Sequence, residues 1–188
     1  MIPLTEPNKG VLMSRIKAIK VEEATGKTAE LYSAIKSNLG VVPNVFQALG
    51  TSPHVLETFL GFGGAVKSLS AAEKESLALA VAQANSCNYC LAAHTAIGKK
   101  VGLADEQILN ARKAQSADNK IDALVKLTRE IVTEKGHVSD ATFKNFISAG
   151  YNESQVPEVV LAVVQNIFTN YFNHVNRTVV DFPVVQQL

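Results

Sequence analysis

The chain has 188 residues, of which 47% are hydrophobic and 19% are charged, so it can bury a sizeable core and is not a disordered protein. Because 18 lysines and arginines stand against 17 acids, there is no charge excess to hold phosphates, and we expect no nucleic-acid partner. No apolar run approaches the roughly 20 residues of a membrane helix, and residues 1–17 contain no apolar signal core, so we expect a cytoplasmic protein without membrane contact.

The hydrophobic pattern predicts an all-α fold. Long stretches are rich in Ala, Leu, Glu, Lys and Gln, and the strict apolar-polar alternation that is typical of strands is hard to find. We expect residues 1–20 to form an extended N-terminal arm and residues 21–188 to form a single helical domain. In chain order, the predicted helices cover residues 27–38, about 45–50, 53–69, 71–84, 87–100, 105–114, 119–135, 140–149 and 153–175.

Two of these helices are predicted to form a hairpin around residue 86. Ser70 and Glu73 have the spacing of a capping box, which starts the helix over residues 71–84. Asn85 and Ser86 then break the helical pattern. Ser86 is a good N-cap for the next helix, which would carry Cys87 in its first turn.

Both cysteines of the chain lie at this second helix start. Cys87 and Cys90 form a Cys-x-x-Cys pair, and the pKa of a thiol falls near a helix N-terminus and within such a pair. His94 follows Cys90 by four residues and lies on the same helical face, where its imidazole can take the thiol proton. The pattern favours redox chemistry of the two thiols, with His94 as the base.

The preceding helix carries an acid that can orient this base. Glu75 falls on the inward stripe with Leu79 and Ala82, whereas Glu73 is accounted for by the capping box. An acid on an apolar face either supports a neighbouring base or is an edge residue paired with a lysine, and the sequence leaves both interpretations open.

Zinc binding is an alternative from a different class. Cys87, Cys90 and His94 are three potential ligands, and Glu75 would then act as a base on bound water. A structural zinc site needs a fourth ligand, and the sequence has no second Cys/His pair to supply it. Three ligands within one and a half turns of a single helix would also distort the tetrahedral coordination of zinc, so we expect no metal. The two thiols could instead be inert and buried, or the chain could be a non-catalytic oligomeric helical protein that acts through its surface.

The sequence shows no organic cofactor site. Residues 61–64, Gly-Phe-Gly-Gly, lack the full dinucleotide fingerprint and do not follow a strand, so they indicate close helix packing or a kink. His54 and His137 lie near helix ends and are predicted to be surface residues. His174 lies late in an apolar helix and is predicted to be a core histidine, although a place in a cavity or a subunit interface is also open. With Ser86 and Tyr89, it is a possible supporting residue of the site.

The spacing of Glu75, eleven residues, Cys87-x-x-Cys90, three residues and His94 resembles the alkylhydroperoxidase D-like branch of the carboxymuconolactone decarboxylase superfamily. VPNVFQALGTSPHVLETFLGFGG and NYFNHVNRTVVDFP also resemble the longer, peroxidase-related members, so the resemblance covers most of residues 20–184. It implies an all-α homo-oligomer, a trimer or a multiple such as a hexamer. The implied activity is a thiol-dependent peroxidase or disulfide reductase, and stress defence is a plausible setting for this antioxidant chemistry.

The resemblance also implies a role for each site residue. Cys90 would attack a hydroperoxide and become a sulfenic acid, with His94 as its base and Glu75 in the proton relay, and Cys87 would resolve the sulfenic acid to a disulfide. An unidentified external dithiol would then reduce this disulfide, and a small disulfide is the alternative substrate. Tyr89 stands where the family has a second histidine, and tyrosine is a poor base near neutral pH. The decarboxylase branch acts without a redox cysteine pair, so the pair argues against that reaction.

Overall fold

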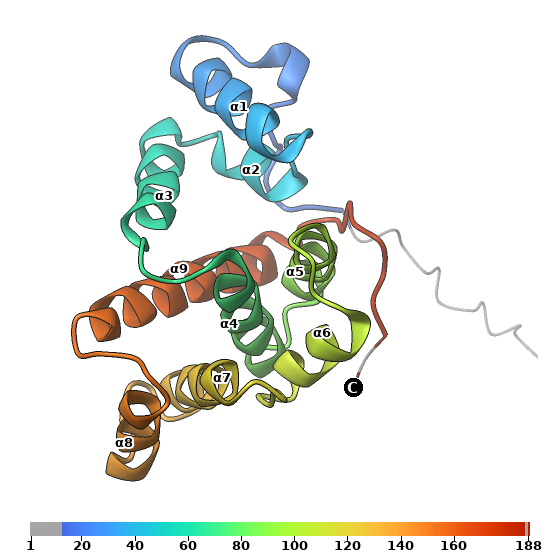
Figure 1. Cartoon of the computed structure of the whole chain (residues 1–188). Helices are drawn as coiled ribbons and strands as arrows, with labels where there is room; N and C mark the ends of the chain where they lie inside the picture. The colour runs from blue at the N-terminus through green and yellow to red at the C-terminus, as the bar shows by residue number, and fades with distance from the viewer. Residues whose placement is uncertain (1–12, 187) are drawn as a thin grey trace, which may run out of the picture.

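The computed structural model describes residues 13–186 and 188, and over these residues it is built of helices and loops (Figure 1). The all-α prediction is confirmed. A short 3-10 turn, Val21–Glu23, precedes α1 (Gly26–Leu39), α2 (Asn44–Leu49), α3 (Pro53–Ala65), α4 (Ala71–Ala84), α5 (Asn88–Lys100), α6 (Asp105–Arg112), α7 (Asn119–Thr133), α8 (Asp140–Ser148) and α9 (Gln155–Asn176). Residues 13–20 of the predicted arm contain no helix, and residues 1–12 lie outside the described part of the chain.

Helix α4 is the centre of the fold. It packs against α5, α6, α7 and α9, while α1, α2 and α3 form a separate layer that meets α9 through α3 (Figure 1). Leu77, Leu79 and Val81 of α4 are completely buried, as expected of a helix that is apolar on nearly all sides. Because small alanines alternate with these large residues, neighbouring helices approach α4 closely. No helix in the described residues has the length and apolar character needed to span a membrane.

The core of the described residues divides into three clusters, and one of them contains the cysteine pair. One cluster joins α1, α2 and α3 to the start of α5 and contains Cys87, Tyr89 and Cys90. The others join α4 to α7, α8 and α9 and to α6. The cysteines therefore lie where the N-terminal layer meets the helices around α4.

Four predicted helix boundaries differ from the structure by two residues or more. Helices α6 and α7 end at Arg112 and Thr133, each two residues earlier than expected, and the other two are in α3 and α9. Helix α3 ends at Ala65 rather than at residue 69, because the amides of Lys67 and Ser68 donate to Glu158 Oε2 at 2.7 and 2.8 Å instead of continuing the helix. Helix α9 begins at Gln155, two residues later than expected. The close packing expected of the glycines in residues 61–64 is not found, since a Cβ at Gly61 or Gly64 would meet nothing within 4 Å and one at Gly63 would make an ordinary contact of 3.4 Å with the side chain of Gln165.

The capping box at the start of α4 is confirmed and extends into a buried network. Ser70 Oγ accepts from the Glu73 amide, and Glu73 Oε2 accepts from the Ser70 amide at 2.7 Å. Glu73 Oε1 accepts from the Tyr151 hydroxyl at 2.7 Å and lies 3.3 Å from Lys120 Nζ. Burial alone would raise the pKa of Glu73, but the hydrogen bonds from Tyr151 and Ser70 and the charge of Lys120 together lower it.

Removing the Tyr151 hydroxyl is expected to destabilise the fold in a pH-dependent way. Tyr151→Phe should lower the free energy of unfolding at pH 7 by about 2 kcal/mol, because a bond to a charged group is lost. A pKa that is lowered by folding contributes stability above the unfolded pKa, and this contribution is lost as the pH falls through the folded value. Urea unfolding at pH 7 and about pH 3 should therefore show a smaller difference in acid. Tyr171→Phe is the exposed control, and an equal difference at both pH values would contradict the expectation.

Candidate functional site

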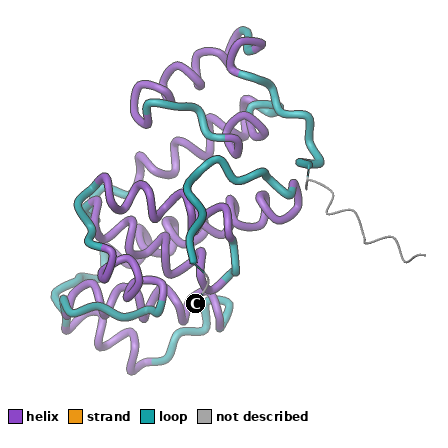
Figure 2. The backbone as a smooth tube through the Cα atoms, turned by 90° about the vertical axis from the view of Figure 1, so that its right-hand side faces the viewer, coloured by secondary structure: helices purple, strands orange, loops and turns teal. Residues whose placement is uncertain are grey.

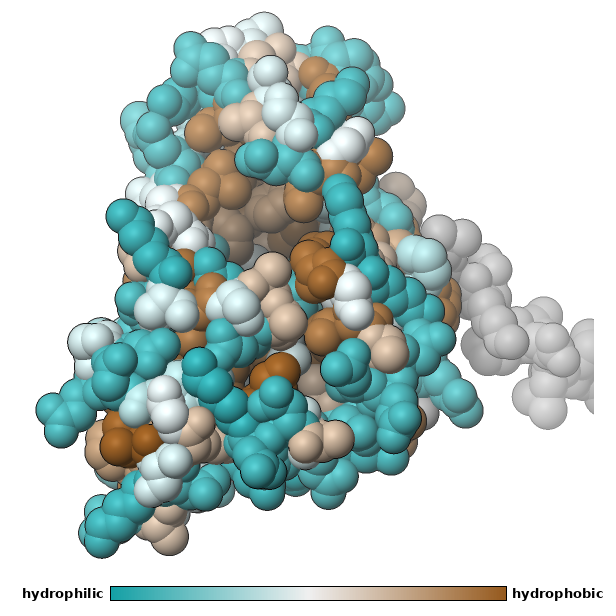
Figure 3. Space-filling model, viewed as in Figure 1, coloured by the Kyte–Doolittle hydropathy of each residue, from teal (hydrophilic) through white to brown (hydrophobic). Residues whose placement is uncertain are grey.

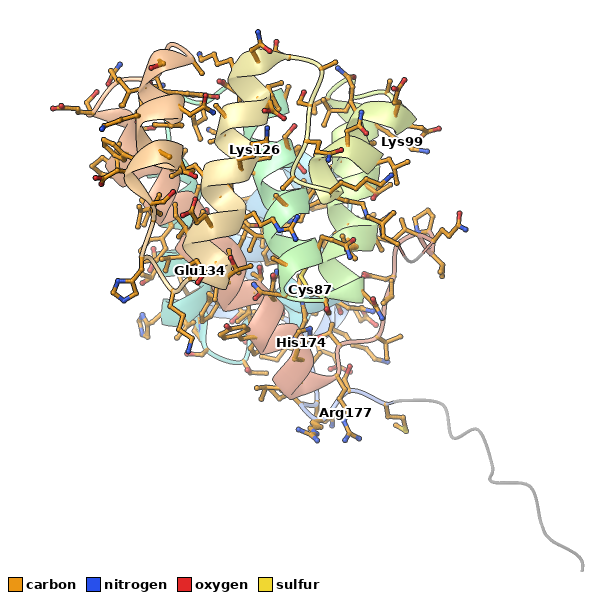
Figure 4. The ribbon with its side chains drawn as sticks, turned by 90° about the horizontal axis from the view of Figure 1, so that it is seen from below. Cys87, Lys99, Lys126, Glu134, His174 and Arg177 are labelled. Atoms are coloured by element: carbon orange, nitrogen blue, oxygen red, sulfur yellow. A yellow bond between two sulfur atoms is a disulfide. The ribbon has the colours of Figure 1, made fainter. Side chains whose placement is uncertain are left out.

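Cys87 and Cys90 are joined by a disulfide at the turn between α4 and α5. Their Cα atoms are 5.3 Å apart, a distance that a disulfide can span. Cys87 is the N-cap of α5, and its Sγ accepts from the Cys90 amide at 3.3 Å. Figure 4 labels Cys87 at this point and His174 on the last turns of α9. The cysteine pair thus lies at the N-terminus of a helix, as the sequence predicted.

The prediction that Ser86 caps this helix is wrong by one residue. Ser86 has a φ of +54°, in the left-handed region, and is exposed. This conformation ends α4 and turns the Cys87 amide back to the Ala82 carbonyl at 2.9 Å. Cys87 is therefore the extended residue from which α5 starts, and its sulfur takes the position that a serine oxygen usually occupies.

The two sulfurs have different surroundings. Cys87 is completely buried, whereas Cys90, at 3% exposure, lines a pocket of about 470 Å³. This pocket lies between the α1–α3 layer and helices α4, α5 and α9, where Figure 3 shows a hollow with a hydrophobic lining. Most of its wall is apolar and includes Val45, Phe46, Phe59, Leu60, Ile97 and Phe182. A ligand in the pocket meets Cys90 and not Cys87.

His94 and Glu75 form a pair in the wall of the same pocket. His94 Nδ1 lies 2.8 Å from Glu75 Oε2, and the two side chains are 21% and 14% exposed. If Glu75 is ionised, its carboxylate can only accept, and His94 Nδ1 is then the donor while Nε2 is left to take a proton. Glu75 therefore pairs with His94 and not with a lysine. His94 follows Cys90 by one helical turn, a rise of about 6 Å, on the same face of α5.

Tyr89 connects three distant parts of the chain. Its hydroxyl donates to Asp181 Oδ1 at 2.7 Å and accepts from the Val45 amide at 3.2 Å, while Asp181 Oδ2 accepts from the Asn44 amide at 2.8 Å. Figure 2 shows the segment after α9 as a loop that runs back along the helices. Burial, with a further contribution from Asp181, raises the pKa of Tyr89, so it stays a neutral phenol. Tyr89 therefore connects the start of α5 to α2 and to the segment beyond α9.

Sequence reasoning missed two polar residues at the site. Asp181 lies beyond α9 and reaches Tyr89 only through the fold. Asn173 of α9 donates from Nδ2 to Cys90 Sγ at 3.4 Å and also lines the pocket. A signal for Asn173 was present, because asparagines recur on one face of α9 at positions 166, 170, 173 and 176.

The other histidines lie away from the pocket. His54 and His137 are exposed, so both surface predictions are confirmed. His174 is also exposed, and the prediction of a core histidine is wrong. Because successive residues of a helix are turned by about 100°, the inward position of Asn173 places His174 on the outer face of α9.

The geometry gives no support to the zinc alternative. Among the described residues, no three His, Cys, Asp or Glu side chains are grouped so that they could hold a metal ion. The two sulfurs form a disulfide with each other, and His94 Nδ1 forms a hydrogen bond with Glu75.

Part of the chain is similar to a known sequence family. Residues 53–132, which contain α3, the α4–α5 hairpin and most of α7, match the sequence model of the carboxymuconolactone decarboxylase family. No curated protein gives a significant match to the chain.

Several solved structures share this fold. An uncharacterized peroxidase-related protein from Ralstonia eutropha JMP134, described as an alkylhydroperoxidase AhpD core, superimposes with a TM-score of 0.78 at 20% identity, over 90% of this chain and 93% of that chain. A peroxidase-related protein from Silicibacter sp. TM1040 gives 0.77 at 18%, over 90% and 94%. The debrominase Bmp8 C82A in complex with 2,3,4-tribromopyrrole gives 0.76 at 17%, over 92% and 93%. At these identities, the similarity establishes a common fold.

Proposed function

We propose, from the premise that this chain is a member of the carboxymuconolactone decarboxylase superfamily with the AhpD-like fold, that it is a thiol-dependent peroxidase that reduces organic hydroperoxides. The observation that carries the proposal is that Cys90 and the His94–Glu75 pair lie in the wall of one pocket. Cys87 is buried next to Cys90 and forms a disulfide with it.

The first step uses the reduced protein. His94 Nε2 takes the proton of Cys90, and Glu75 stabilises the resulting imidazolium. The Cys90 thiolate attacks the terminal oxygen of R–O–O–H, so that an S–O bond forms while the O–O bond breaks. The leaving RO⁻ takes the proton from His94 and departs as the alcohol ROH. Cys90 is now a sulfenic acid, and the hydroperoxide has gained two electrons.

The second step forms the disulfide that the structure contains. The Cys87 sulfur attacks the Cys90 sulfur, the S–S bond forms, and the hydroxyl group leaves as water with the proton of the Cys87 thiol. An external dithiol then attacks the disulfide from the pocket at Cys90, and Cys87 leaves as a thiolate that the Cys90 amide stabilises. The dithiol becomes a disulfide and both cysteines return to the reduced state.

The pocket supports an organic hydroperoxide as the substrate. Most of its wall is apolar, and its volume of about 470 Å³ is within the range of sites that hold small organic ligands. A substrate with a hydrocarbon or aromatic body would bury that body against Phe46, Phe59 and Leu60 and bring its O–O bond to Cys90. Hydrogen peroxide has no such body and gains nothing from this wall.

Narrowing the pocket should separate these two substrates. Ala93 lines the pocket one turn after Cys90, and Ala93→Phe would fill part of the pocket. We expect the variant to lower kcat/KM for cumene hydroperoxide by more than roughly tenfold and to change that for hydrogen peroxide by less than about threefold. Ala117→Phe, a substitution outside the pocket, is the control. A colorimetric assay of the remaining peroxide measures the turnover of both substrates, and gas chromatography of the alcohol product confirms the turnover of cumene hydroperoxide. Failure of the wild-type reduced protein to form any alcohol would reject the proposed function.

A second candidate reaction uses the same thiol pair. The similar fold of a debrominase and the phenylalanine-lined pocket favour the reductive removal of bromide from an aromatic ring. Two thiols would supply two electrons, so that Ar–Br becomes Ar–H while the disulfide and HBr form. Bromide release from a bromopyrrole, measured in parallel with alcohol formation from a hydroperoxide, distinguishes the two reactions.

We also propose that the chain forms a homo-oligomer. Helix α9 exposes a row of apolar side chains on the face opposite its asparagines, namely Val160, Val164, Phe168, Tyr171 and Val175. Such a row is unfavourable in water unless another surface covers it, and a second copy of the chain is the expected cover. Sedimentation equilibrium tests the expected trimer or hexamer.

A further inference from the structure

Asn173 is a buried side chain at the reacting sulfur, and its carbonyl oxygen has no hydrogen-bond partner among the described residues. It is 4% exposed, and its Nδ2 donates to Cys90 Sγ at 3.4 Å. Within the described residues, its Oδ1 is buried and has no hydrogen-bond partner. Since buried polar atoms in native proteins nearly always have a partner, this oxygen is suited to a ligand that carries a donor.

The orientation of the carboxamide follows from the chemistry of its neighbour. A disulfide sulfur carries no hydrogen, so it can only accept, and the NH₂ group of Asn173 must be the part that faces Cys90. The carbonyl oxygen is then left over beside the sulfur. Asn173 also belongs to the wall of the pocket that Cys90 lines.

The neighbouring asparagines show that the unused oxygen is particular to Asn173. Asn170 is completely buried one turn earlier on α9, and its Oδ1 accepts from Asn85 Nδ2 at 3.0 Å. Asn176 is completely buried one turn later, and its Oδ1 accepts from the Ile16 amide at 2.8 Å. Both carbonyl oxygens have protein partners, whereas that of Asn173, a residue of the pocket wall, has none among the described residues.

We propose that Asn173 is a catalytic residue that holds the hydroperoxide against Cys90. Its Oδ1 accepts a hydrogen bond from the terminal O–H of the substrate, and its Nδ2 donates to the Cys90 sulfur. This inference rests on the proposed peroxidase function. The carboxamide then forms hydrogen bonds with both the Cys90 sulfur and the terminal oxygen of the hydroperoxide, the two atoms that the new S–O bond will join.

The contact persists through the step. The hydroperoxide hydrogen stays on the terminal oxygen while the S–O bond forms and the O–O bond breaks, and the proton that completes the alcohol comes from His94. The same O–H therefore becomes the hydroxyl of the sulfenic acid and still donates to Asn173 Oδ1. Because the contact requires an O–H donor, its loss should affect hydroperoxides and not thiol reagents that lack a donor.

The test uses protein with Cys87→Ser, so that Cys90 is the one thiol and each reaction stops after a single event. The rate constant with cumene hydroperoxide is measured by mass spectrometry of the sulfenic acid. The rate constant with methyl methanethiolsulfonate, which has no hydrogen-bond donor, is measured by mass spectrometry of the mixed disulfide that it forms with Cys90. Asn173→Leu removes both hydrogen bonds, so the fall in the thiolsulfonate rate measures the loss at the sulfur alone, and the hydroperoxide rate should fall roughly ten- to hundredfold further. Asn170→Leu, the buried control outside the pocket, should change neither rate by more than about threefold.

Three results would overturn the proposal. An unchanged hydroperoxide rate means that Asn173 does not hold the substrate, and an equal fall for both reagents means that it acts only on the sulfur or on the local structure. A Cys87→Ser protein with Asn173 intact that reacts with the thiolsulfonate but not with the hydroperoxide rejects the proposed function itself. Thermal unfolding checks each variant, and Asn173→Ala replaces the leucine variant under the same criteria if that variant does not fold.

Discussion

Replacing Cys90 with serine is expected to lower hydroperoxide reduction by more than roughly a thousandfold, even in a single turnover, because a serine hydroxyl at this position has no thiolate to offer the O–O bond. Cys87→Ser should also stop steady turnover. It should, however, still reduce one equivalent of hydroperoxide and stop at the Cys90 sulfenic acid. The difference follows from the pocket, which Cys90 lines while Cys87 is completely buried behind it.

Dimedone labelling and mass spectrometry of the two variants measure this difference. The Cys87→Ser protein should give one dimedone adduct on Cys90 after hydroperoxide, and the Cys90→Ser protein should give none on Cys87. The wild-type protein serves as the control, since its sulfenic acid is consumed by the second thiol. Stoichiometric reduction of hydroperoxide by Cys90→Ser would show that the two cysteines have the opposite roles.

Loss of the proton relay is expected to have the second-largest effect. His94→Gln removes the base that takes the thiol proton and returns it to the alcohol, and we expect kcat/KM for the hydroperoxide to fall roughly a hundred- to thousandfold. Glu75→Gln removes the charge that stabilises the imidazolium and fixes the hydrogen on Nδ1, and we expect a fall of roughly ten- to a hundredfold.

The double variant distinguishes a relay from two separate effects. If His94 and Glu75 act as a unit, adding Glu75→Gln to His94→Gln should cost little more than His94→Gln alone. Steady-state assays of the two single variants and the double variant provide the cycle, with the exposed pair His137→Gln and Glu134→Gln as controls. Full additivity, or activity that survives His94→Gln, would mean that the 2.8 Å contact is only structural.

The helices could be predicted because their signals are local. The capping box of Ser70 and Glu73 fixes the start of α4, and the Cys-x-x-Cys pair with His94 on the next helix needs only the period of a helix to share one face. The error at Ser86 is also local in origin, because sequence alone does not show that the residue takes a left-handed conformation to end α4. Because Ser86 is used for this turn, Cys87 is the N-cap of α5.

The pocket could not be predicted because its parts are distant in the chain. Tyr89, Asp181 and the amides of Asn44 and Val45 meet only after α2, α5 and the segment beyond α9 pack together. Asn173 gave a weak signal as part of the asparagine row of α9, but a helical period shows which residues share a face and not what that face contacts. Its bond to the Cys90 sulfur depends on packing between helices that are far apart in sequence.

The central claim is that Cys87 and Cys90 are a redox pair that a hydroperoxide oxidises, and intact mass of alkylated protein tests it most directly. Reduced protein should take two N-ethylmaleimide groups, protein treated with one equivalent of cumene hydroperoxide should take none, and dithiothreitol should restore both. A contradictory result would be two thiols that still react after the hydroperoxide has been added. Zinc content measured on the same sample gives the other contradiction, which is one bound zinc per chain with thiols that react only after chelation.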